Sequence, residues 1–408
     1  MVVDVRMQGF RQRSEVPVVL EWIDRNAVRL GPESVPLDAC VDRVLAGDVV
    51  AGIDVPGFDR AAMDGYALRG EETSGASEYN PLTFPVAGQV LPAQPLGTTV
   101  ARGGAVRIMT GAPVPTGVDA VVPAEFATET AGRIEITRPV APGQHVAHVG
   151  EDVRAGSVVL PSGRRLRPQD AGLVASLGQS HVTAVRQPCV RIVVTGNEVV
   201  APGTGKNPYQ VYDANSYMLR GLLARDGGVL ESARRLGDHP DAIRDALVAP
   251  GADVILVSGG SSVGSEDHAP RLVAEAGELA IHGVAMRPSS PAGAGRVGAA
   301  LVFLLPGNPV SCLCAYDFFA GRAIRIMGGR SPDWPHRALR APVARKIVSA
   351  IGRVDYCRVR LVPEGAEPIA LSGASILSST TRADGFVVVP AESEGYAPGT
   401  EVTVYLYD

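Results

Sequence analysis

The fold is decided by a short apolar run and the polar loop after it, DVILV at residues 253–257 and SGGSSVGSED at residues 258–267. An aliphatic run that ends at glycines predicts a buried β-strand. The glycines and serines of the loop allow backbone N–H groups to approach an anion closely, and the loop ends in the carboxylate of Asp267. The stretch therefore predicts a strand that carries a phosphate-binding loop with an acidic end.

This loop differs from both common nucleotide-binding loops. No lysine follows Gly264, as a Walker A loop would require, and the pattern G-x-G-x-x-G is absent. The sequence therefore argues against an ordinary nucleotide site.

Two more strand-and-loop units have the same design. VRIVV at 190–194 leads into TGNE at 195–198, and ALVFLL at 300–305 leads into PGNPVS at 306–311. In the second unit Asn308 is expected to cap a helix that begins at Pro309, with N–H groups facing outward. If the three strands share one parallel sheet, their loops meet beyond its carboxyl edge, where open α/β sheets bind ligands. This edge is the candidate site.

Composition limits the class of protein. The 408 residues are 46% apolar and 20% charged with a net charge of −5, which predicts a soluble chain of several domains. A basic surface for nucleic acid is not expected. No run reaches the ~18 apolar residues of a membrane span, and the polar N-terminus does not resemble a signal peptide, so a cytoplasmic location is predicted. Five cysteines without paired spacing indicate reduced thiols.

The pattern along the chain predicts a multidomain α/β plus β protein. Helical periodicity is expected at 17–23, 37–46 and 168–177, whereas short β segments cut by Gly and Pro fill the region between the second and third helices. Strands then alternate with helices, as in a mostly parallel sheet, before an all-β tail. The predicted domains are a helical linker domain (1–50 and 149–187), a β-rich module (51–148), an α/β domain (188–328) and a C-terminal small β-barrel (329–408).

The β-rich module contains two motifs of its own. MDGYA at 63–67 places Asp64 beside a glycine, and RIMTGAPVP at 107–115 offers the hydroxyl of Thr110 at a tight turn.

Together these motifs resemble the molybdopterin molybdenumtransferase family, which includes bacterial MoeA and the E domain of gephyrin. The resemblance covers essentially the whole chain. It rests on seven segments in family order: MDGYA at 63–67, RIMTGAPVP at 107–115, GEDV at 150–153, TGNE at 195–198, DAN at 213–215, GGSSVGSED at 259–267 and LPGNPVS at 305–311.

The resemblance implies a transferase that inserts molybdenum into adenylylated molybdopterin, releasing AMP and giving molybdenum cofactor. It implies an elongated homodimer, in which Asp64 and Thr110 of one subunit face Glu198, Asp238 and Asp267 of the other as catalytic residues. It also implies molybdate and adenylylated molybdopterin as substrates, and the molybdopterin adenylyltransferase or recipient molybdoenzymes as further partners. The substrate-binding residues would be Thr195, Gly196, Gly259, Gly260, Ser262, Gly264, Arg287, Ser290, Pro306, Gly307, Asn308 and Ser311.

Chemistry agrees with a Mg²⁺ site at Asp238 and Asp267, because Mg²⁺ takes one or two carboxylates together with substrate phosphate oxygens. Glu198 would orient or deprotonate a water. Each residue also has a purely structural alternative. Asp64 and Thr110 could be turn residues, Asp238 and Asn308 could cap helices, and Glu198 could be a surface charge.

One segment departs from the family pattern. The family has a basic Pro-Gly-Lys-Pro loop, but this chain reads MRPSSP at 286–291, with Ser290 at the lysine position. Arg287 is expected to supply the missing positive charge. The lost lysine keeps a second interpretation open, a gephyrin-like dimeric scaffold with weak or absent catalysis. A third interpretation, an adenylyltransferase domain, leaves the flanking β regions unexplained.

Overall fold

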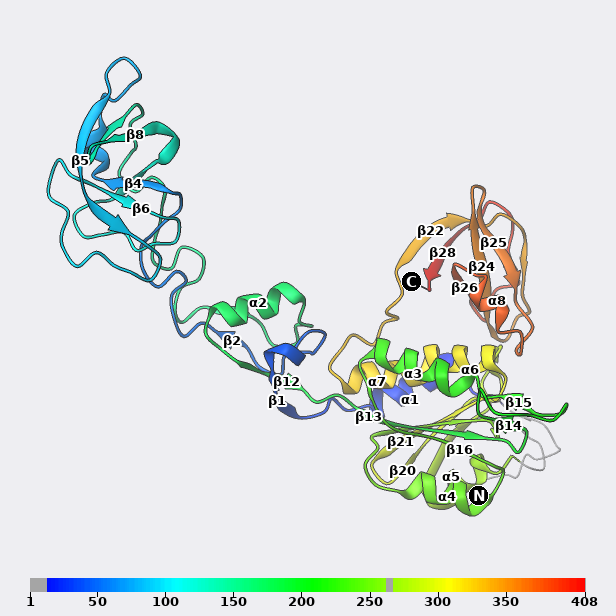
Figure 1. Ribbon diagram of the computed structural model, residues 1–408. Coiled ribbons are helices and arrows are strands. Elements are labelled where there is room, and N and C mark those ends of the chain that lie inside the picture. Colours follow the sequence, from blue (N-terminus) through cyan, green and yellow to red (C-terminus); the bar gives the residue numbers. More distant parts are fainter. Residues whose placement is uncertain (1–12, 262–266, 408) are drawn as a thin grey trace. The chain divides into compact units, whose positions relative to one another are not determined.

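The computed structural model describes residues 13–261 and 267–407 (Figure 1). Its described residues form two compact units, one containing 13–34, 42–46 and the chain from 183 onward, and the other containing 35–41 and 47–182. None of the helices in the described part of the chain is long and apolar enough to cross a membrane.

The first unit is built on a mixed six-stranded sheet. The first four strands in its order run parallel, and the last two run antiparallel to their neighbours. The three strands singled out in the sequence, β13, β17 and β21, are therefore adjacent, and their loops leave the same edge. The order is β16 (Val229–Leu236), β13 (Cys189–Thr195), β17 (Val254–Ser258), β21 (Ala300–Leu305), β20 (Gly293–Val297) and β18 (Glu278–His282).

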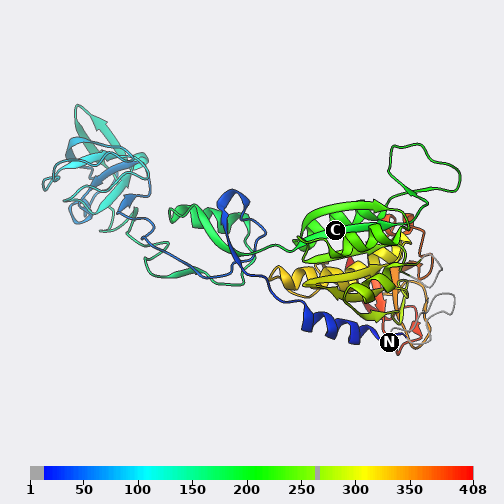
Figure 2. The same cartoon turned by 90° about the horizontal axis from the view of Figure 1, so that it is seen from below.

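Helices cover both faces of this sheet (Figures 1 and 2). Side chains alternate along β13, so Ile192 and Val194 enter one apolar core and Val193 enters the other. Burial on both faces explains why the strands are continuous apolar runs. One face carries α1 (Val16–Asn26), α3 (Asn215–Asp226), α6 (Pro309–Ala315), the π-helical turn η4 (Tyr316–Ala320) and α7 (Gly321–Met327), and the other carries α4 (Pro240–Val248) and α5 (Ala269–Ala276).

Two expectations for the N-terminal region are wrong. Helix α1 exists, but Val16, Val19 and Ile23 pack in the core of the α/β sheet, so α1 does not belong to a helical domain with 149–187. The helix expected at 37–46 is absent. β1 (Pro32–Pro36) precedes that region, which contains the short 3₁₀ turn η1 (Leu37–Ala39) and an isolated bridge from Leu45 to Ala184. Asp42 has a φ of 69°, which a right-handed helix cannot accommodate.

The C-terminal region forms a curved sheet in the order β19, β24, β26, β28, β22, with β25 also paired to β24. After β22, Val343 forms an isolated bridge to Ala366 of β25 and the N–H of Ala344 donates to the carbonyl of Ala366 at 3.0 Å, but no regular ladder among the described residues closes the sheet there. The elements are β19 (Met286–Arg287), β22 (Ala338–Pro342), β23 (Ile347–Val348), β24 (Val354–Val362), β25 (Gly365–Ala370), α8 (Ser378–Thr381), β26 (Gly385–Val389), β27 (Gly395–Tyr396) and β28 (Glu401–Leu406).

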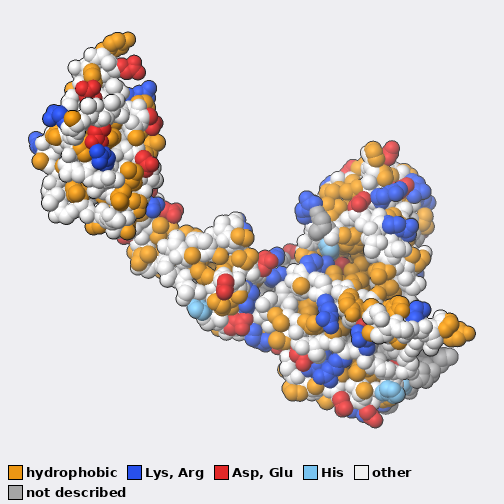
Figure 3. All heavy atoms as spheres, in the orientation of Figure 1, with side chains coloured by type: hydrophobic (Ala, Val, Ile, Leu, Met, Phe, Trp, Pro, Cys, Tyr) orange, Lys and Arg blue, Asp and Glu red, His pale blue; other side chains and the backbone are white. Residues whose placement is uncertain are grey.

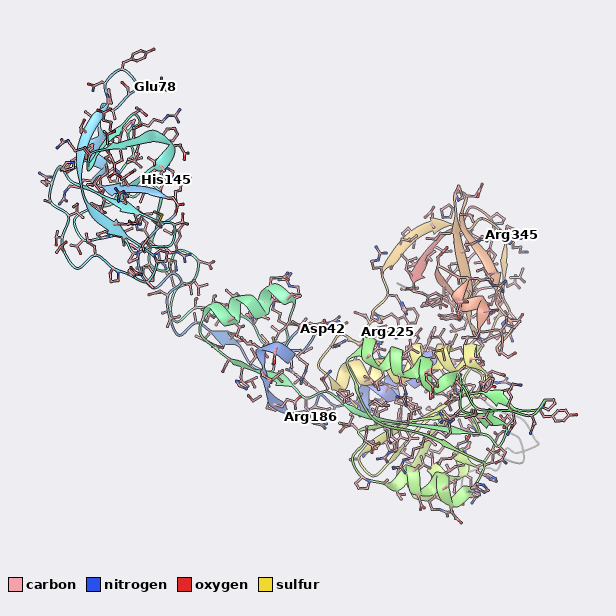
Figure 4. The ribbon with its side chains drawn as sticks, viewed as in Figure 1. Asp42, Glu78, His145, Arg186, Arg225 and Arg345 are labelled. Atoms are coloured by element: carbon pink, nitrogen blue, oxygen red, sulfur yellow. The ribbon has the colours of Figure 1, made fainter. Side chains whose placement is uncertain are left out.

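Aromatic contacts join this sheet to the helix layer, and charged contacts hold two elements of the helix layer together. Trp334 packs edge-on against Phe318 of η4 and Phe386 of β26. Arg225 of α3, labelled in Figure 4, donates hydrogen bonds to the buried carboxylate of Asp317 at 2.7 Å and to Asp226 at 2.8 Å. Because a buried carboxylate needs such partners, the cluster fixes α3 against η4.

The second unit contains a six-stranded sheet in the order β7, β4, β6, β5, β9, β8. The expected helix at 168–177 is present as α2 (Pro168–Ser176). The remaining elements are β2 (Val49–Val50), β3 (Arg60–Ala61), β4 (Gly65–Leu68), η2 (Gly70–Thr73), β5 (Leu82–Val90), β6 (Ala105–Ile108), β7 (Ala120–Pro123), η3 (Ala124–Phe126), β8 (Ala127–Thr130), β9 (Arg133–Ile136), β10 (Val146–Ala147), β11 (Val158–Leu160) and, where the chain passes to the first unit, β12 (His181–Val185).

Candidate functional site

The loops after β13, β17 and β21 enclose a cavity of about 720 Å³, a size that suits a small-molecule ligand. The three carboxylates proposed from the sequence for this unit, Glu198, Asp238 and Asp267, all line it. The predicted convergence of the strand ends is therefore present. The other predicted residues that line it are Thr195, Gly196, Gly259, Gly260, Pro306, Gly307 and Asn308.

Two glycines after β17 allow the loop to lie directly on the end of β13. Gly259 and Gly260 have φ values of 96° and 55°, and a Cβ on Gly259 would lie 2.5 Å from the carbonyl oxygen of Thr195. A Cβ on Gly260 would lie 2.9 Å from Thr195 Oγ1 and 4.0 Å from Asp267 Oδ1. Only glycine fits this approach. Two further predicted residues of the loop, Ser262 and Gly264, lie outside the described residues.

Asp238 follows β16 and ties two loops together. Its Oδ2 accepts a hydrogen bond from the backbone N–H of Asn197 at 3.0 Å, and Asn197 Oδ1 accepts one from the N–H of Asp238 at 3.2 Å. The N-terminal cap of α4 is His239, so Asp238 does not occupy the capping position. Glu198 is exposed and folds back over Gly196, whose Cβ position would lie 2.8 Å from both carboxylate oxygens.

The inner wall of the cavity carries Asn215, the first residue of α3, which the sequence reasoning did not select as a ligand residue. Its Nδ2 donates to the carbonyl of Gly307 and to Ser258 Oγ, both at 2.8 Å. A carbonyl only accepts hydrogen bonds, so the orientation of the amide is fixed. The buried atoms Asn215 Oδ1 and Thr195 Oγ1 have no hydrogen-bond partner among the described residues. Buried polar atoms normally have one, which favours a polar occupant at this wall.

The sequence reasoning also missed Tyr212, the only aromatic residue among the described residues that line the cavity. It ends β15 (Val211–Tyr212), which pairs with β14 (Val199–Val200), and the residue is 45% exposed. The hydroxyl donates to the carbonyl of Thr204 at 2.9 Å, which holds the ring in place. The loop between the two strands projects from the unit and exposes hydrophobic side chains, including Tyr209 (Figures 2 and 3).

A second hollow of about 790 Å³ lies between the α/β region and the C-terminal sheet, and shares Pro291, Pro306 and Asn308 with the first cavity. Arg287, Ser290 and Ser311, all predicted as ligand residues, line it. Asn308 is the N-cap of α6 but makes no side-chain capping bond, contrary to expectation.

The guanidinium of Arg287 is engaged in a way that the sequence did not indicate. It donates through Nε to Asp355 Oδ1 at 3.0 Å and through Nη2 to Asp355 Oδ2. Arg353, which was also missed, lies 3.4 Å from Asp355 Oδ1. Arg287 therefore shares a fully buried carboxylate with a second arginine at the wall of the hollow.

In the other unit, the side chains of Asp64 and Thr110 contact each other. Asp64 Oδ1 accepts hydrogen bonds from the Thr110 N–H at 2.6 Å and its hydroxyl at 2.7 Å. The antiparallel pairing of Gly65 with Ile108 brings the two motifs together. The backbone N–H of Thr110, and then its hydroxyl, lower the pKa of Asp64.

The described residues contain no cluster of three or more His, Cys, Asp or Glu side chains that could enclose a metal ion. This arrangement still fits Mg²⁺, which keeps water ligands and binds through one or two carboxylates plus substrate phosphates. Asp238 and Asp267 supply such a pair at one cavity.

Comparison with known proteins shows that three family models match successive parts of the chain. Residues 15–178 match the MoeA N-terminal region (domain I and II), 191–325 match a probable molybdopterin binding domain, and 340–407 match the MoeA C-terminal region (domain IV). Molybdopterin molybdenumtransferase 2 of Mycobacterium tuberculosis is 36% identical over 386 residues, which cover 92% of this chain and 95% of that protein. The chain belongs to the MoeA family.

Other MoeA relatives agree. The molybdopterin molybdenumtransferase of Haemophilus influenzae is 32% identical, with 91% of this chain and 93% of that protein covered. Two solved structures of the MoeA protein from Pyrococcus horikoshii, each 32% identical, cover 97% of this chain and 100% of their own, with TM-scores of 0.80 and 0.71. The resemblance found in the motifs is confirmed at the level of the family.

Proposed function

We propose that this chain is a molybdopterin molybdenumtransferase, which inserts molybdenum into adenylylated molybdopterin and releases AMP. The observation that carries the proposal is the convergence of Asp238 and Asp267 with the glycine loop at one cavity. Carboxylates for a hard cation and backbone that approaches closely are what a phosphoanhydride substrate requires.

Asp238 and Asp267 would hold Mg²⁺, which when bound neutralises phosphate charge and polarises the phosphoryl group. Glu198, exposed at the mouth, orients or deprotonates the attacking water. The water oxygen bonds to one phosphorus as the bridging P–O bond breaks. AMP then leaves with its phosphate, and the pterin keeps its own.

The pterin ring occupies the first cavity, and molybdate reaches the pterin sulfurs from the second hollow, past Arg287, Ser290 and Ser311. As the two pterin sulfurs bond to molybdenum, one oxo ligand of molybdate leaves as water with the two thiol protons, so no oxidant or reductant is consumed. The wall shared by the two cavities, Pro291, Pro306 and Asn308, supports this arrangement.

The proposal includes a cytoplasmic homodimer. In it, Asp64 and Thr110 of one subunit complete the site formed by Glu198, Asp238 and Asp267 of the other. Light scattering is expected to give a dimer at micromolar concentration, and a monomer would contradict this part. Mixed dimers of Asp64→Ala and Asp267→Asn subunits should regain part of the activity, because one of their two sites is intact.

The assay that tests the function combines purified protein, adenylylated molybdopterin, Mg²⁺ and molybdate. We expect AMP release and molybdenum cofactor formation, both abolished by chelation of Mg²⁺. A stable dimer that binds the pterin but releases no AMP would instead favour the scaffold interpretation, which Ser290 at the family lysine position keeps open.

A further inference from the structure

The second hollow is a concentration of positive charge in an acidic chain. The charged residues among its described lining are Arg13, Arg287, Arg353 and one acid, Glu15. The chain as a whole has a net charge of −5. Three guanidinium groups at one hollow are suited to an oxyanion, because each presents a planar set of N–H donors.

The positive charges of Arg287 and Arg353 are partly neutralised by a carboxylate outside the lining of the hollow. Both contact Asp355, whose side chain is 0% exposed and whose Oδ2 also accepts the hydroxyl of Ser349 at 2.7 Å. Asp355 does not line the hollow itself. One carboxylate therefore balances one of these two cations, which makes the third arginine important for the net charge.

Arg13 comes from a different part of the chain and is placed by backbone pairing. The N–H of Ser14 donates to the carbonyl of Gly283 at 2.9 Å, and the N–H of Ala285 donates to the carbonyl of Ser14 at 2.8 Å. Val284 in turn donates to the carbonyl of Ser290 at 2.8 Å. The segment before α1 is thus attached to residues 283–285, which lead into the 286–291 segment.

The side chain of Arg13 contacts that loop directly. Its Nε donates to Ser290 Oγ at 2.7 Å. A hydroxyl that accepts from a guanidinium still has its own hydrogen to donate, and that hydrogen points away from the arginine. Ser290 also lines the hollow, so the pair offers a positive charge and an oriented hydroxyl donor to the same space.

We propose that Arg13, acting with Ser290, binds the tetrahedral oxyanion substrate in this hollow. The inference rests on the proposed function for the identity of that substrate, molybdate. Arg13 is a substrate-binding residue that raises the affinity for the anion and leaves hydrolysis of the phosphoanhydride to the carboxylates of the first cavity.

The test is equilibrium binding of molybdate to the full-length protein by calorimetry, in the absence of pterin. Arg13→Ala is expected to weaken molybdate binding by about tenfold or more, because it removes a charge-assisted hydrogen-bond donor. Arg13→Lys should retain part of the affinity through its charge. Glu15→Gln should act in the opposite direction and tighten binding, since it removes the one acid of the lining.

Two further variants make the result specific. Arg25→Ala removes the same charge from α1, at a side chain that is 72% exposed and paired with Glu21, and is expected to leave binding unchanged. In a double-mutant cycle, Arg13→Ala and Ser290→Ala together should cost less than the product of their separate effects, because the two residues act through one hydrogen bond.

Arg13→Ala with a molybdate affinity within twofold of wild type would overturn the inference, whatever the AMP assay shows. Wild-type protein that binds molybdate in an Arg13-dependent manner but releases no AMP would contradict the proposed function and leave the inference about Arg13 intact. Wild-type protein that binds no molybdate at all would overturn the inference as well.

Discussion

The two adjoining cavities of the first unit are built in different ways. The first is formed by loops that directly follow neighbouring strands of one sheet, and its chemistry is carried by glycines, an amide and carboxylates. The second is formed by five stretches far apart in the sequence, at residues 13–15, 285–291, 306–311, 350–353 and 372–374, and its positive charge is carried by arginines. We infer that the two cavities have separate roles: the first binds and hydrolyses the phosphoanhydride, and the second binds the oxyanion.

The largest effect is expected on stability, from the loss of Asp355, the buried carboxylate that contacts Arg287 and Arg353. Asp355→Ala should lower the free energy of unfolding by about 3–5 kcal/mol, because it leaves two guanidinium groups without their buried partner. Urea unfolding, followed by circular dichroism, measures the change. Glu364→Ala, an exposed acid in the turn between β24 and β25, is the control and should change stability by less than about 0.5 kcal/mol. Equal stability of the two variants would show that Asp355 does not hold the hollow together.

The second-largest effect is expected on the rate of AMP release, from a carboxylate of the first cavity. Asp267→Asn should reduce Mg²⁺-dependent AMP release by on the order of 10²-fold while the fold is retained, because the amide keeps the shape but loses the negative charge. Asp241→Asn in α4, with a side chain that is 93% exposed, should behave as wild type. A normal rate with unchanged Mg²⁺ dependence in Asp267→Asn would remove this carboxylate from the proposed metal site.

A smaller effect is expected from the aromatic wall of the first cavity. Tyr212→Leu should weaken pterin binding by about fivefold, the size of one aromatic stacking contact, and Tyr212→Phe should retain most of the affinity. Fluorescence titration with the pterin substrate gives both values. Tyr209→Leu, in the same projecting loop but outside the cavity lining, is the matched control. Equal losses in Tyr209→Leu and Tyr212→Leu would indicate an effect on the loop and not on the ligand contact.

The same contrast explains what the sequence could predict. Strand-and-loop units are local, so the runs ending at Thr195, Ser258 and Leu305 were enough to place the first cavity. Tyr212 and Asn215 were missed as ligand residues because their positions depend on how β15 and α3 pack. Arg287, Ser290 and Ser311 of the second hollow were predicted as ligand residues. The part of Arg13 could not be predicted, because nothing local connects Arg13 to Ser290, 277 positions away.

The errors in the fold have a similar origin. The periodicity of 17–23 predicts a helix, but not that its apolar face enters the core of the α/β sheet. The apolar spacing of 37–46 is compatible with a helix, and the left-handed conformation of Asp42 is set by the surrounding chain. The local pattern therefore identified α1 correctly as a helix, whereas tertiary packing decided where that helix lies.

The separate roles of the two cavities are tested most directly by AMP release at increasing molybdate concentration, measured in wild type, Arg13→Ala and Asp267→Asn. We predict that Arg13→Ala requires about tenfold more molybdate but reaches the wild-type rate of molybdate-dependent AMP release at saturation. Asp267→Asn should remain about 10²-fold slower at every molybdate concentration. An Arg13→Ala variant that stays slow at saturating molybdate, or an Asp267→Asn variant rescued by it, would contradict the assignment of separate roles to the two cavities.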